Sequence, residues 1–209
     1  MVQGSLLAQP EEIAPDIWLL PQFTSAQALW GDLQAVAGRA PFRHMMTHTG
    51  YPTAAAMTNC GAVGWTSEAG GYSYRPHDPE TGKPWPEIPM AWCMLAQRAA
   101  MTAGYPDYMP DICLVNRYSV GTGMGRHCDN SEQDFSHPIV SVSLGLPTTF
   151  AWWGATPSGS GQNLLLQDGD VLVWGRTARL GYHAVRPVPD GQHSLCGRYR
   201  YNLTFRKAR

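Results

Sequence analysis

The pattern of apolar and polar positions changes near residue 110, midway along a chain of 209 residues. Before that point, two segments have the apolar spacing of amphipathic helices. Residues 25–38 begin at Ser25, a residue type that caps helix N-termini, and end at Gly38. Residues 90–103 repeat this spacing, with a glycine directly after them. We therefore predict two helices, with short strands and turns over residues 50–89 between them.

After residue 110 the pattern becomes one of short apolar segments separated by turns rich in glycine. This pattern is typical of an all-β sandwich or barrel. No repeat or change in composition marks a second domain, so residues 1–209 are expected to form one mainly β domain with flanking helices. The predicted strands are residues 111–120, 126–129, 138–146, 149–153, 163–166, 170–174, 182–186 and 199–206.

The last predicted strand, residues 199–206, has two chemically different faces. Side chains alternate along a strand, so Arg200, Asn202 and Arg206 share one face, and aromatic and apolar residues share the other. An edge strand with one face in water would give this pattern. The alternative is a barrel whose polar interior holds an anionic ligand, because the planar fork of arginine matches a carboxylate with two hydrogen bonds. Residues 111–120 support the barrel, since one face of that strand turns from apolar to polar toward its end.

His127 and Asp129 are spaced so that both side chains leave one face of a strand. A His-x-Asp triplet arises often by chance, but His183, on a later predicted strand, supplies a third candidate ligand. Two imidazoles and one carboxylate are the ligand set of non-haem Fe(II) oxygenases. Three positions on the ion stay open, two for a bidentate 2-oxo acid and one for O2. The second carboxylate of that acid needs a cation, which the arginines of the last strand offer.

Zinc is the main alternative for these ligands, because a zinc ion would use its fourth position for water in a hydrolytic reaction. A zinc hydrolase has no need for two arginines on a polar strand face downstream of its ligands. The combination of ligand set and arginines therefore favours iron.

Composition and cysteine usage narrow the class of protein. Hydrophobic residues make up 44% of the chain and charged residues 15%, which excludes intrinsic disorder. No apolar run approaches the roughly 18 residues that a bilayer span needs, and the first twenty residues lack the cationic start of a secretory signal. Five scattered cysteines without a CxxC pair indicate free thiols in a reducing compartment. A cytoplasmic protein is expected, with no membrane contact.

Charge is unevenly distributed, although the net charge is only -1. Residues 176–209 contain eight arginines or lysines and one acidic residue. Such a segment can bind a polyanionic partner, and it can equally be a solvated charged face. A non-catalytic β-barrel that binds nucleic acid through this segment therefore remains an alternative.

Taken in order, the motifs resemble the AlkB family of Fe(II)/2-oxoglutarate dioxygenases. The resemblance extends from about Pro41 to Arg206, and motifs this numerous in this order are highly specific. The motifs are Gly64-Trp65-Thr66, Gly71-Tyr72-Ser73-Tyr74, Asn116-Arg117-Tyr118, His127-x-Asp129, Gly169-Asp-Val-Leu-Val-Trp174, His183 and Arg200-Tyr-Asn202-Leu-Thr-Phe-Arg206.

The resemblance implies a double-stranded β-helix, or jelly-roll, core over residues 108–209, with a nucleotide-recognition lid over residues 41–90. It implies that three residues are the catalytic iron ligands, that Arg200 pairs with the distal carboxylate of 2-oxoglutarate, and that Arg206 lies nearer its chelating end. The implied metal ligands are His127, Asp129 and His183; the implied 2-oxoglutarate residues are Asn116, Arg117, Tyr118, Arg200, Asn202 and Arg206; the implied substrate residues are Trp65, Tyr72, Ser73, Tyr74 and Ser131.

The implied activity is oxidative dealkylation repair of bases such as 1-methyladenine and 3-methylcytosine. Decarboxylation of 2-oxoglutarate is coupled to hydroxylation of the alkyl group, with release of formaldehyde. The implied partner of this monomer is single-stranded or double-stranded DNA, with RNA as a further substrate. An oxygenase of the same fold that acts on tRNA, protein or lipid is the alternative, and ordinary packing is the alternative role for the aromatic residues of the lid.

Two positions depart from the family pattern. Ser131 stands where bacterial members place an acidic residue near the alkylated base, with Glu132 beside it. Neighbouring strand positions point to opposite faces, so we expect Glu132 not to replace the missing charge, and we expect weaker discrimination between cationic and neutral lesions. Residues 155–161 also lack the basic residues usual at this point of the lid.

Overall fold

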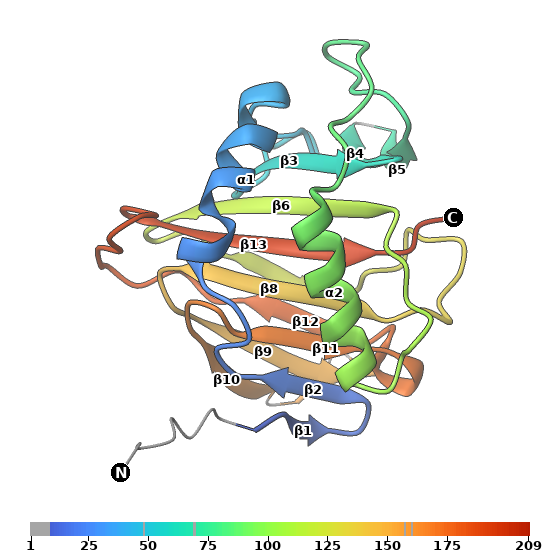
Figure 1. Ribbon diagram of the computed structural model, residues 1–209, viewed down its shortest axis with the longest axis vertical. Coiled ribbons are helices and arrows are strands. Elements are labelled where there is room, and N and C mark those ends of the chain that lie inside the picture. The colour runs from blue at the N-terminus through green and yellow to red at the C-terminus, as the bar shows by residue number, and fades with distance from the viewer. Residues whose placement is uncertain (1–8, 48, 69, 157, 160) are drawn as a thin grey trace.

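The computed structural model describes residues 9–47, 49–68, 70–156, 158–159 and 161–209 (Figure 1). Within these residues, seven strands form the larger sheet, four form a second sheet, and two form a separate hairpin. The larger sheet has the order β1 (Glu11–Ala14), β2 (Ile17–Leu20), β11 (Val171–Trp174), β8 (Ile139–Gly145), β13 (Tyr199–Arg206), β6 (Ile112–Ser119), β3 (Ala56–Gly61). The smaller sheet has the order β10 (Gln162–Leu166), β9 (Thr148–Gly154), β12 (Tyr182–Val185), β7 (Met124–His127), and the hairpin is β4 (Gly64–Glu68) with β5 (Gly71–Arg75).

The two main sheets form the jelly-roll core that the sequence predicts. Their strands pair in antiparallel fashion, and inward-facing residues of both sheets line one cavity. Residues 41–90 contribute to two separate sheets of this fold. Strand β3 extends the larger sheet at its edge, whereas the β4–β5 hairpin forms a sheet of its own.

Both α-helices lie against the larger sheet, on the side away from the cavity (Figure 1). Helix α1 (Ala26–Arg39) begins at the predicted cap, where the Ser25 hydroxyl accepts a hydrogen bond from the Ala28 amide at 3.3 Å. It ends at Arg39 rather than at Gly38, because an exposed glycine inside a helix costs only about 1 kcal/mol relative to alanine. Helix α2 (Met90–Thr102) begins at the predicted residue and ends one residue earlier.

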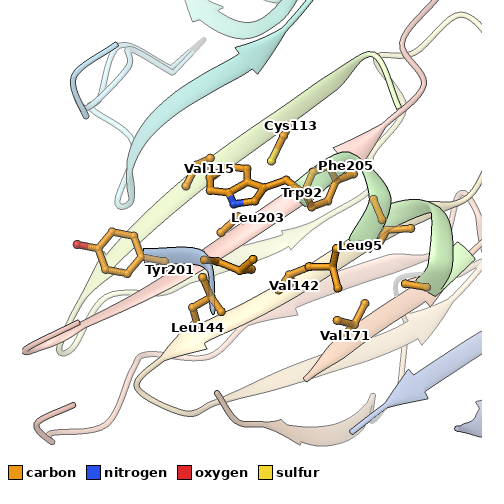
Figure 2. Close-up of a cluster of buried hydrophobic side chains, with 14 of the residues drawn as sticks. Trp92, Leu95, Cys113, Val115, Val142, Leu144, Val171, Tyr201, Leu203 and Phe205 are labelled. Carbon is orange, nitrogen blue, oxygen red and sulfur yellow. The ribbon is translucent and has the colours of Figure 1, made fainter. Parts of the chain in front are cut away.

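The side chains of α2 pack on the apolar face of β13 (Figure 2). Trp92 is fully buried and meets Phe205 edge to face, with ring centroids 6.4 Å apart. Strand β13 lies between β8 and β6, so it is not an edge strand, and all of its residues after Tyr199 are buried. The alternative of an edge strand with a wet face is therefore wrong. The helices cover one face of β13, and its opposite face lines the cavity.

Four elements differ from the sequence prediction. Strands β1 and β2 were not predicted, because segments of four residues carry too little alternation to be recognised. The short 3-10 helix η1 (Arg176–Ala178) was not predicted either. Strand β7 ends at His127, which pairs with His183 of β12, so Asp129 lies beyond the strand and not within it. No helix among the described residues is long and apolar enough to cross a bilayer.

Candidate active site

A cavity of about 300 Å³ lies between the two main sheets and opens under the β4–β5 hairpin. Its walls come from both main sheets, from the β4–β5 hairpin and from the loop after β7. The larger sheet contributes the polar face of β13 and the inner residues of β6, the smaller sheet contributes β7, β9 and β12, and the hairpin contributes two aromatic rings. The residues most relevant to chemistry are Trp65, Tyr72, Asn116, Tyr118, His127, Asp129, Ser131, Glu132, His183, Arg200, Asn202 and Arg206.

His127, Asp129 and His183 converge at the inner end of β7 and β12. One ligand atom from each of them lies within 4.8 Å of the other two. The Nε2 atoms of His127 and His183 are each 3.8 Å from a different oxygen of Asp129. Asp129 leaves the strand after His127 and turns its carboxylate toward both rings, so the three groups surround one point.

Hydrogen bonds fix the tautomer of both imidazoles. Nδ1 of His127 lies 2.8 Å from the carbonyl oxygen of Gly125, and Nδ1 of His183 lies 3.0 Å from that of Gly181. A carbonyl only accepts, so each Nδ1 must donate a proton, and the Nε2 atom is the one that carries the lone pair in the neutral form of each ring. This is the arrangement found for histidines that bind metals.

The electrostatics of the cluster also suit a cation. Burial lowers the pKa of His183 to about 4, with a further contribution from His127, so its imidazole is neutral at neutral pH. Burial opposes ionisation of Asp129, but Arg206 and the two imidazoles outweigh it and hold the pKa of that carboxyl well below its usual range. The neutral imidazole of His183 and the Asp129 carboxylate are thus ready for Fe(II) without loss of a proton.

Arg200 is buried at the far end of the cavity, with 1% of its surface exposed. It donates hydrogen bonds to the Ser143 hydroxyl at 3.0 Å and to the Tyr201 carbonyl at 3.1 Å, and its guanidinium lies 5.8 Å from the centre of the Tyr118 ring. No carboxylate pairs with it among the described residues, and its Nε atom has no hydrogen-bond partner there. Burial consequently lowers the pKa of Arg200 to about 10.

Polar neighbours of Arg200 complete this wall. Asn202 donates to the Ser141 hydroxyl at 2.7 Å and accepts from the Thr204 hydroxyl at 2.9 Å. The buried Oδ1 atom of Asn116 has no partner among the described residues. Burial raises the pKa of Tyr118 to about 12, so its hydroxyl stays protonated and can donate. An uncompensated cation beside unsatisfied polar atoms fits a dicarboxylate such as 2-oxoglutarate.

Arg206 has a different environment from Arg200, although both leave the same face of β13. Its Nη2 atom is 2.6 Å from the Asp129 carboxylate, and its Nε atom is 3.3 Å from that of Glu132. The Tyr74 hydroxyl donates to Glu132 at 2.7 Å and accepts from Arg206 at 3.2 Å. Burial alone would lower the pKa of Arg206, but these anionic neighbours raise it above its ordinary value.

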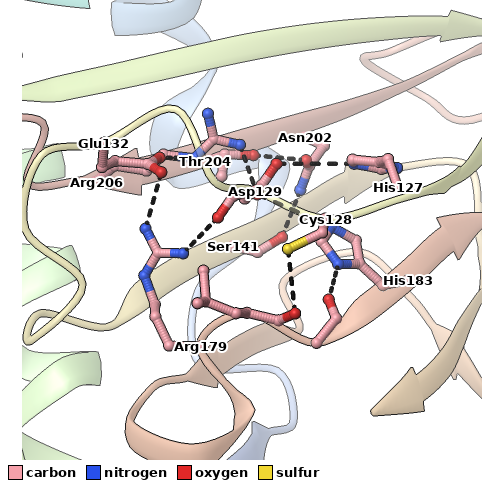
Figure 3. A network of polar contacts seen from close by, with 12 residues as sticks. His127, Cys128, Asp129, Glu132, Ser141, Arg179, His183, Asn202, Thr204 and Arg206 are labelled. Carbon is pink, nitrogen blue, oxygen red and sulfur yellow. Dashed lines mark hydrogen bonds and ion pairs between the residues drawn. The ribbon is translucent and has the colours of Figure 1, made fainter. Parts of the chain in front are cut away.

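Arg179 holds the loop that carries Asp129 (Figure 3). It is 2% exposed and donates to the carbonyls of Asp129 at 2.8 Å and His137 at 3.1 Å. Its third contact is an ion pair with Glu132 at 3.1 Å. Sequence reasoning missed Arg179, because a lone arginine after a predicted strand has no motif that distinguishes it from a surface residue.

The β4–β5 hairpin brings an aromatic pair to the cavity. Trp65 and Tyr72 are stacked, with ring centroids 5.1 Å apart and planes 27° from parallel. The Asn59 side chain bonds both the amide and the carbonyl of Trp65, which fixes that residue's backbone. Tyr72 is 48% exposed, so one partner of the stack is open to solvent at the mouth of the cavity.

The structure does not bring every predicted site residue to the cavity. Arg117 lies on the opposite face of β6 from its two neighbours in sequence, and its guanidinium is 4.7 Å from the Phe42 ring centre and 5.1 Å from that of Tyr199. The two-residue period of the strand is the reason. Ser73 faces Thr66, with hydroxyls 3.0 Å apart, and does not line the cavity. Ser131 does line it, half-buried.

The positive charge of residues 176–209 does not form one basic face. Arg179, Arg200 and Arg206 are buried around the cavity. Arg198 pairs with Asp190 at 2.8 Å, and Lys207 pairs with Asp111 at 3.3 Å. Much of the positive charge of residues 176–209 therefore belongs to an internal site.

Known proteins resemble this chain closely. Residues 16–206 match the 2OG-Fe(II) oxygenase superfamily. The chain is 50% identical over 186 residues to alpha-ketoglutarate-dependent dioxygenase AlkB of Escherichia coli, covering 89% of this chain and 86% of that protein. It is 46% identical over 200 residues to the Salmonella typhimurium protein of the same name, covering 95% and 93%. The solved structure of OsALKBH1 shares the fold, with a TM-score of 0.82 at 24% identity over 95% of this chain and all of that one.

The fold, the site and these similarities define an Fe(II)- and 2-oxoglutarate-dependent dioxygenase, which uses O2 as its oxidant. Within that class the chain belongs to the AlkB family of α-ketoglutarate-dependent dioxygenases, α-ketoglutarate being another name for 2-oxoglutarate. The resemblance inferred from sequence motifs is confirmed. The alternatives of a zinc hydrolase and of a non-catalytic barrel are wrong.

Proposed function

We propose that this enzyme repairs N-alkylated nucleic-acid bases, of the 1-methyladenine and 3-methylcytosine type, by oxidative dealkylation. One observation carries the proposal: a single cavity joins the His–Asp–His cluster, a buried arginine without a carboxylate partner among the described residues, and a stacked aromatic pair at the mouth. These three elements match the needs of a metal, a dicarboxylate co-substrate and a flat aromatic base.

In this proposal His127, Asp129 and His183 hold Fe(II). The iron, with 2-oxoglutarate and O2, supplies the oxidising power that hydroxylates the alkyl carbon while 2-oxoglutarate becomes CO2 and succinate. The hydroxymethyl group on the base nitrogen then leaves as formaldehyde and restores the base. Arg206 and Arg179 keep the Asp129 carboxylate and its loop in place.

Arg200 would bind the distal carboxylate of 2-oxoglutarate. Its guanidinium carries a charge that no described carboxylate compensates, and burial in the cavity strengthens any ion pair formed there. The Tyr118 hydroxyl, protonated at neutral pH, is a second donor, and Asn116 and Asn202 line the same wall. Arg206 lies closer to the metal ligands because it is paired with Asp129, so it would act near the chelating end.

Trp65 and Tyr72 would hold the alkylated base. An extruded base is bound by stacking on aromatic side chains, and Tyr72 is exposed at the mouth where such a base would enter. Ser131 and Tyr74 would lie near that base, Ser131 on the cavity wall and Tyr74 through its hydroxyl at Arg206. Within residues 41–90, we assign the lid to the β4–β5 hairpin, since β3 is part of the core sheet.

The proposed substrate is single-stranded or double-stranded DNA, with RNA as a second polymer, and the proposed setting is the cytoplasm. The five cysteines are free thiols, which suits a reducing compartment. All of the groups discussed come from one chain, so a monomer is sufficient for activity, and sedimentation at working concentration tests that state.

Succinate release tests the proposal and separates it from an oxygenase that acts on protein or lipid. The holoenzyme with Fe(II), 2-oxoglutarate and O2 is given an oligonucleotide that contains one methylated base, its unmethylated counterpart, or a mixed peptide library. We expect succinate above background with the methylated oligonucleotide alone. Equal release with methylated and unmethylated oligonucleotides, or stimulation by peptide only, would overturn the proposal.

A further inference from the structure

The outer face of the smaller sheet carries a cluster of one half-buried tryptophan and two exposed arginines. The guanidinium of Arg126 lies 5.0 Å from the centre of the Trp153 ring, and that of Arg186 lies 5.6 Å from it. These residues come from β7, β9 and the residue after β12. Both arginines are exposed to solvent. We call Arg126, Trp153 and Arg186 the Arg–Trp–Arg cluster.

Strand alternation places this cluster outside the cavity but next to its rim. His127, Phe150 and Val185 line the cavity from the same three strands. Arg126 and Arg186 are directly beside His127 and Val185, and Trp153 is three residues after Phe150, so alternation points all three outward. Gly125, directly before Arg126, lines the cavity and is itself exposed. Arg126 therefore lies beside an exposed residue of the cavity wall.

The geometry of the indole is fixed by its surroundings. The Nε1 atom of Trp153 donates a hydrogen bond to the Gly159 carbonyl at 3.1 Å. Gly161 lies so close that a Cβ atom there would be 2.7 Å from Cε2 of the ring. Both α-helices lie against the larger sheet, so neither covers the smaller sheet's outer face (Figure 1). The ring is thus held in one orientation, with two guanidinium groups over it.

The charge of this face suits a polyanion. Strands β7, β9, β10 and β12 contain no aspartate or glutamate, so the strands of the smaller sheet add arginine but no carboxylate to this face. Guanidinium groups bind phosphate oxygens through paired hydrogen bonds, and an indole offers a base a surface for stacking. The cluster combines both functions in one place.

From these observations we propose that the Arg–Trp–Arg cluster is a docking surface for the single strand that flanks the base held in the cavity. The arginines bind backbone phosphates and Trp153 supports a neighbouring base. The nearby segment over residues 155–161 has no arginine or lysine, so the cluster supplies cationic groups that this segment does not. The inference rests on the proposed function, because it requires a nucleic-acid substrate.

The experiment compares a long and a short substrate. The long substrate is a single strand of about a dozen nucleotides with a central 1-methyladenine, a length within the site sizes usual for single-strand binding proteins. The short substrate is the 5′-mononucleotide of 1-methyladenine, which reaches only the cavity. The holoenzyme is tested as wild type, as the double variant Arg126→Gln with Arg186→Gln, and as Trp153→Ala. Arg198→Gln, which changes an exposed arginine paired with Asp190, is the matched control.

For the double variant, we expect the ratio of kcat/KM on the strand to kcat/KM on the mononucleotide to fall about tenfold. When binding of the same strand is measured without O2, the slope of log K against log salt concentration should become shallower by about 1.4. This is the value expected for the loss of two phosphate contacts. Trp153→Ala should lower the ratio with a smaller change in slope, and Arg198→Gln should change neither.

Three results would overturn the inference. The first is an unchanged ratio in the double variant. The second is an equal loss on both substrates, because that places the effect in the cavity. The third is an equal loss in Arg198→Gln, because that shows a general effect of charge. A wild-type enzyme that processes neither substrate would instead contradict the proposed function, so the two failures are distinguishable.

Discussion

Arg200 and Arg206 leave the same face of β13 and enter the same cavity, but only Arg206 has a carboxylate partner within the described part of the chain. Arg206 is 2.6 Å from Asp129, whereas Arg200 contacts a hydroxyl, a carbonyl and an aromatic ring. The folded protein thus compensates one buried cation and leaves the other ready for an anion. Removing Arg200 should therefore weaken binding of 2-oxoglutarate, whereas removing Arg206 should lower the stability of the ligand-free protein.

Replacing Arg200 with methionine should weaken 2-oxoglutarate binding by about 2–5 kcal/mol, as expected for loss of one partner of a buried charged pair. Metal binding should persist, because Arg200 does not contact His127, Asp129 or His183. Calorimetric titration of 2-oxoglutarate into the Fe(II)-loaded protein without O2 measures this loss. A larger loss of affinity in Arg206→Met would show that the assignment of the two carboxylates is reversed.

Replacing Arg206 with methionine should instead lower the stability of the ligand-free protein. It leaves Asp129 and Glu132 buried without their common partner, at a cost of about 3–5 kcal/mol and a decrease in Tm of roughly 10 °C. Arg200→Met should not lower Tm without 2-oxoglutarate, since it removes a cation that the fold does not compensate. Thermal unfolding of both variants without ligand is the check, and equal decreases in Tm would contradict this contrast.

Replacing Arg179 with methionine should disturb the loop that carries Asp129. The variant loses donors to the carbonyls of Asp129 and His137 and leaves Glu132 with one arginine partner. We expect weaker Fe(II) binding and a larger effect on kcat than on the KM for 2-oxoglutarate, because the Arg200 end of the cavity is not touched. Equilibrium metal titration monitors the first effect. Metal affinity equal to wild type would mean that the loop keeps its shape without this residue.

Base preference should depend on Ser131 rather than on Glu132. Glu132 is held by Arg179, Arg206 and Tyr74, so its charge is already neutralised within the protein. Ser131 lines the cavity without a charge, and Ser131→Asp should therefore increase kcat/KM for cationic 3-methylcytosine relative to a neutral etheno base. A preference that Ser131→Asp leaves unchanged but Glu132→Gln abolishes would show that Glu132 already recognises the positive charge.

The sequence predicted the fold where the pattern was strong. Strand β13 alternates over eight residues and was predicted at its observed bounds, and Ser25 marked the start of α1. The strands β1 and β2 were missed because their short segments gain stability from pairing with the larger sheet, a tertiary effect that no local pattern records.

The candidate site could be assembled from spacing and motif order because its groups lie at fixed positions on strands. One feature could have been predicted and was missed: strand alternation sends Arg117 to the Phe42 side of β6, away from the neighbours with which it was grouped. A second feature could not be predicted. The link from Arg179 to Glu132 and Asp129 joins residues that only the fold brings together.

His183 provides the test of the metal assignment. His183→Ala removes one of three ligand groups, so Fe(II) titration should show little binding and turnover of 2-oxoglutarate should be lost. Phe150→Leu, a change in a residue that packs beside the imidazole with ring centroids 5.5 Å apart, is a control for packing. Substantial turnover in His183→Ala with added Fe(II) would contradict the ligand set.

The most direct test of the central claim is the intact mass of a methylated oligonucleotide after reaction with the holoenzyme, measured together with succinate and formaldehyde. The account predicts that a strand with one 1-methyladenine loses the mass of one methylene unit, and that succinate and formaldehyde appear in equal amounts with the demethylated strand. His183→Ala should leave the mass unchanged. Succinate formation with no change in mass for 1-methyladenine or 3-methylcytosine would contradict the account, because the enzyme would then oxidise something other than an alkylated base.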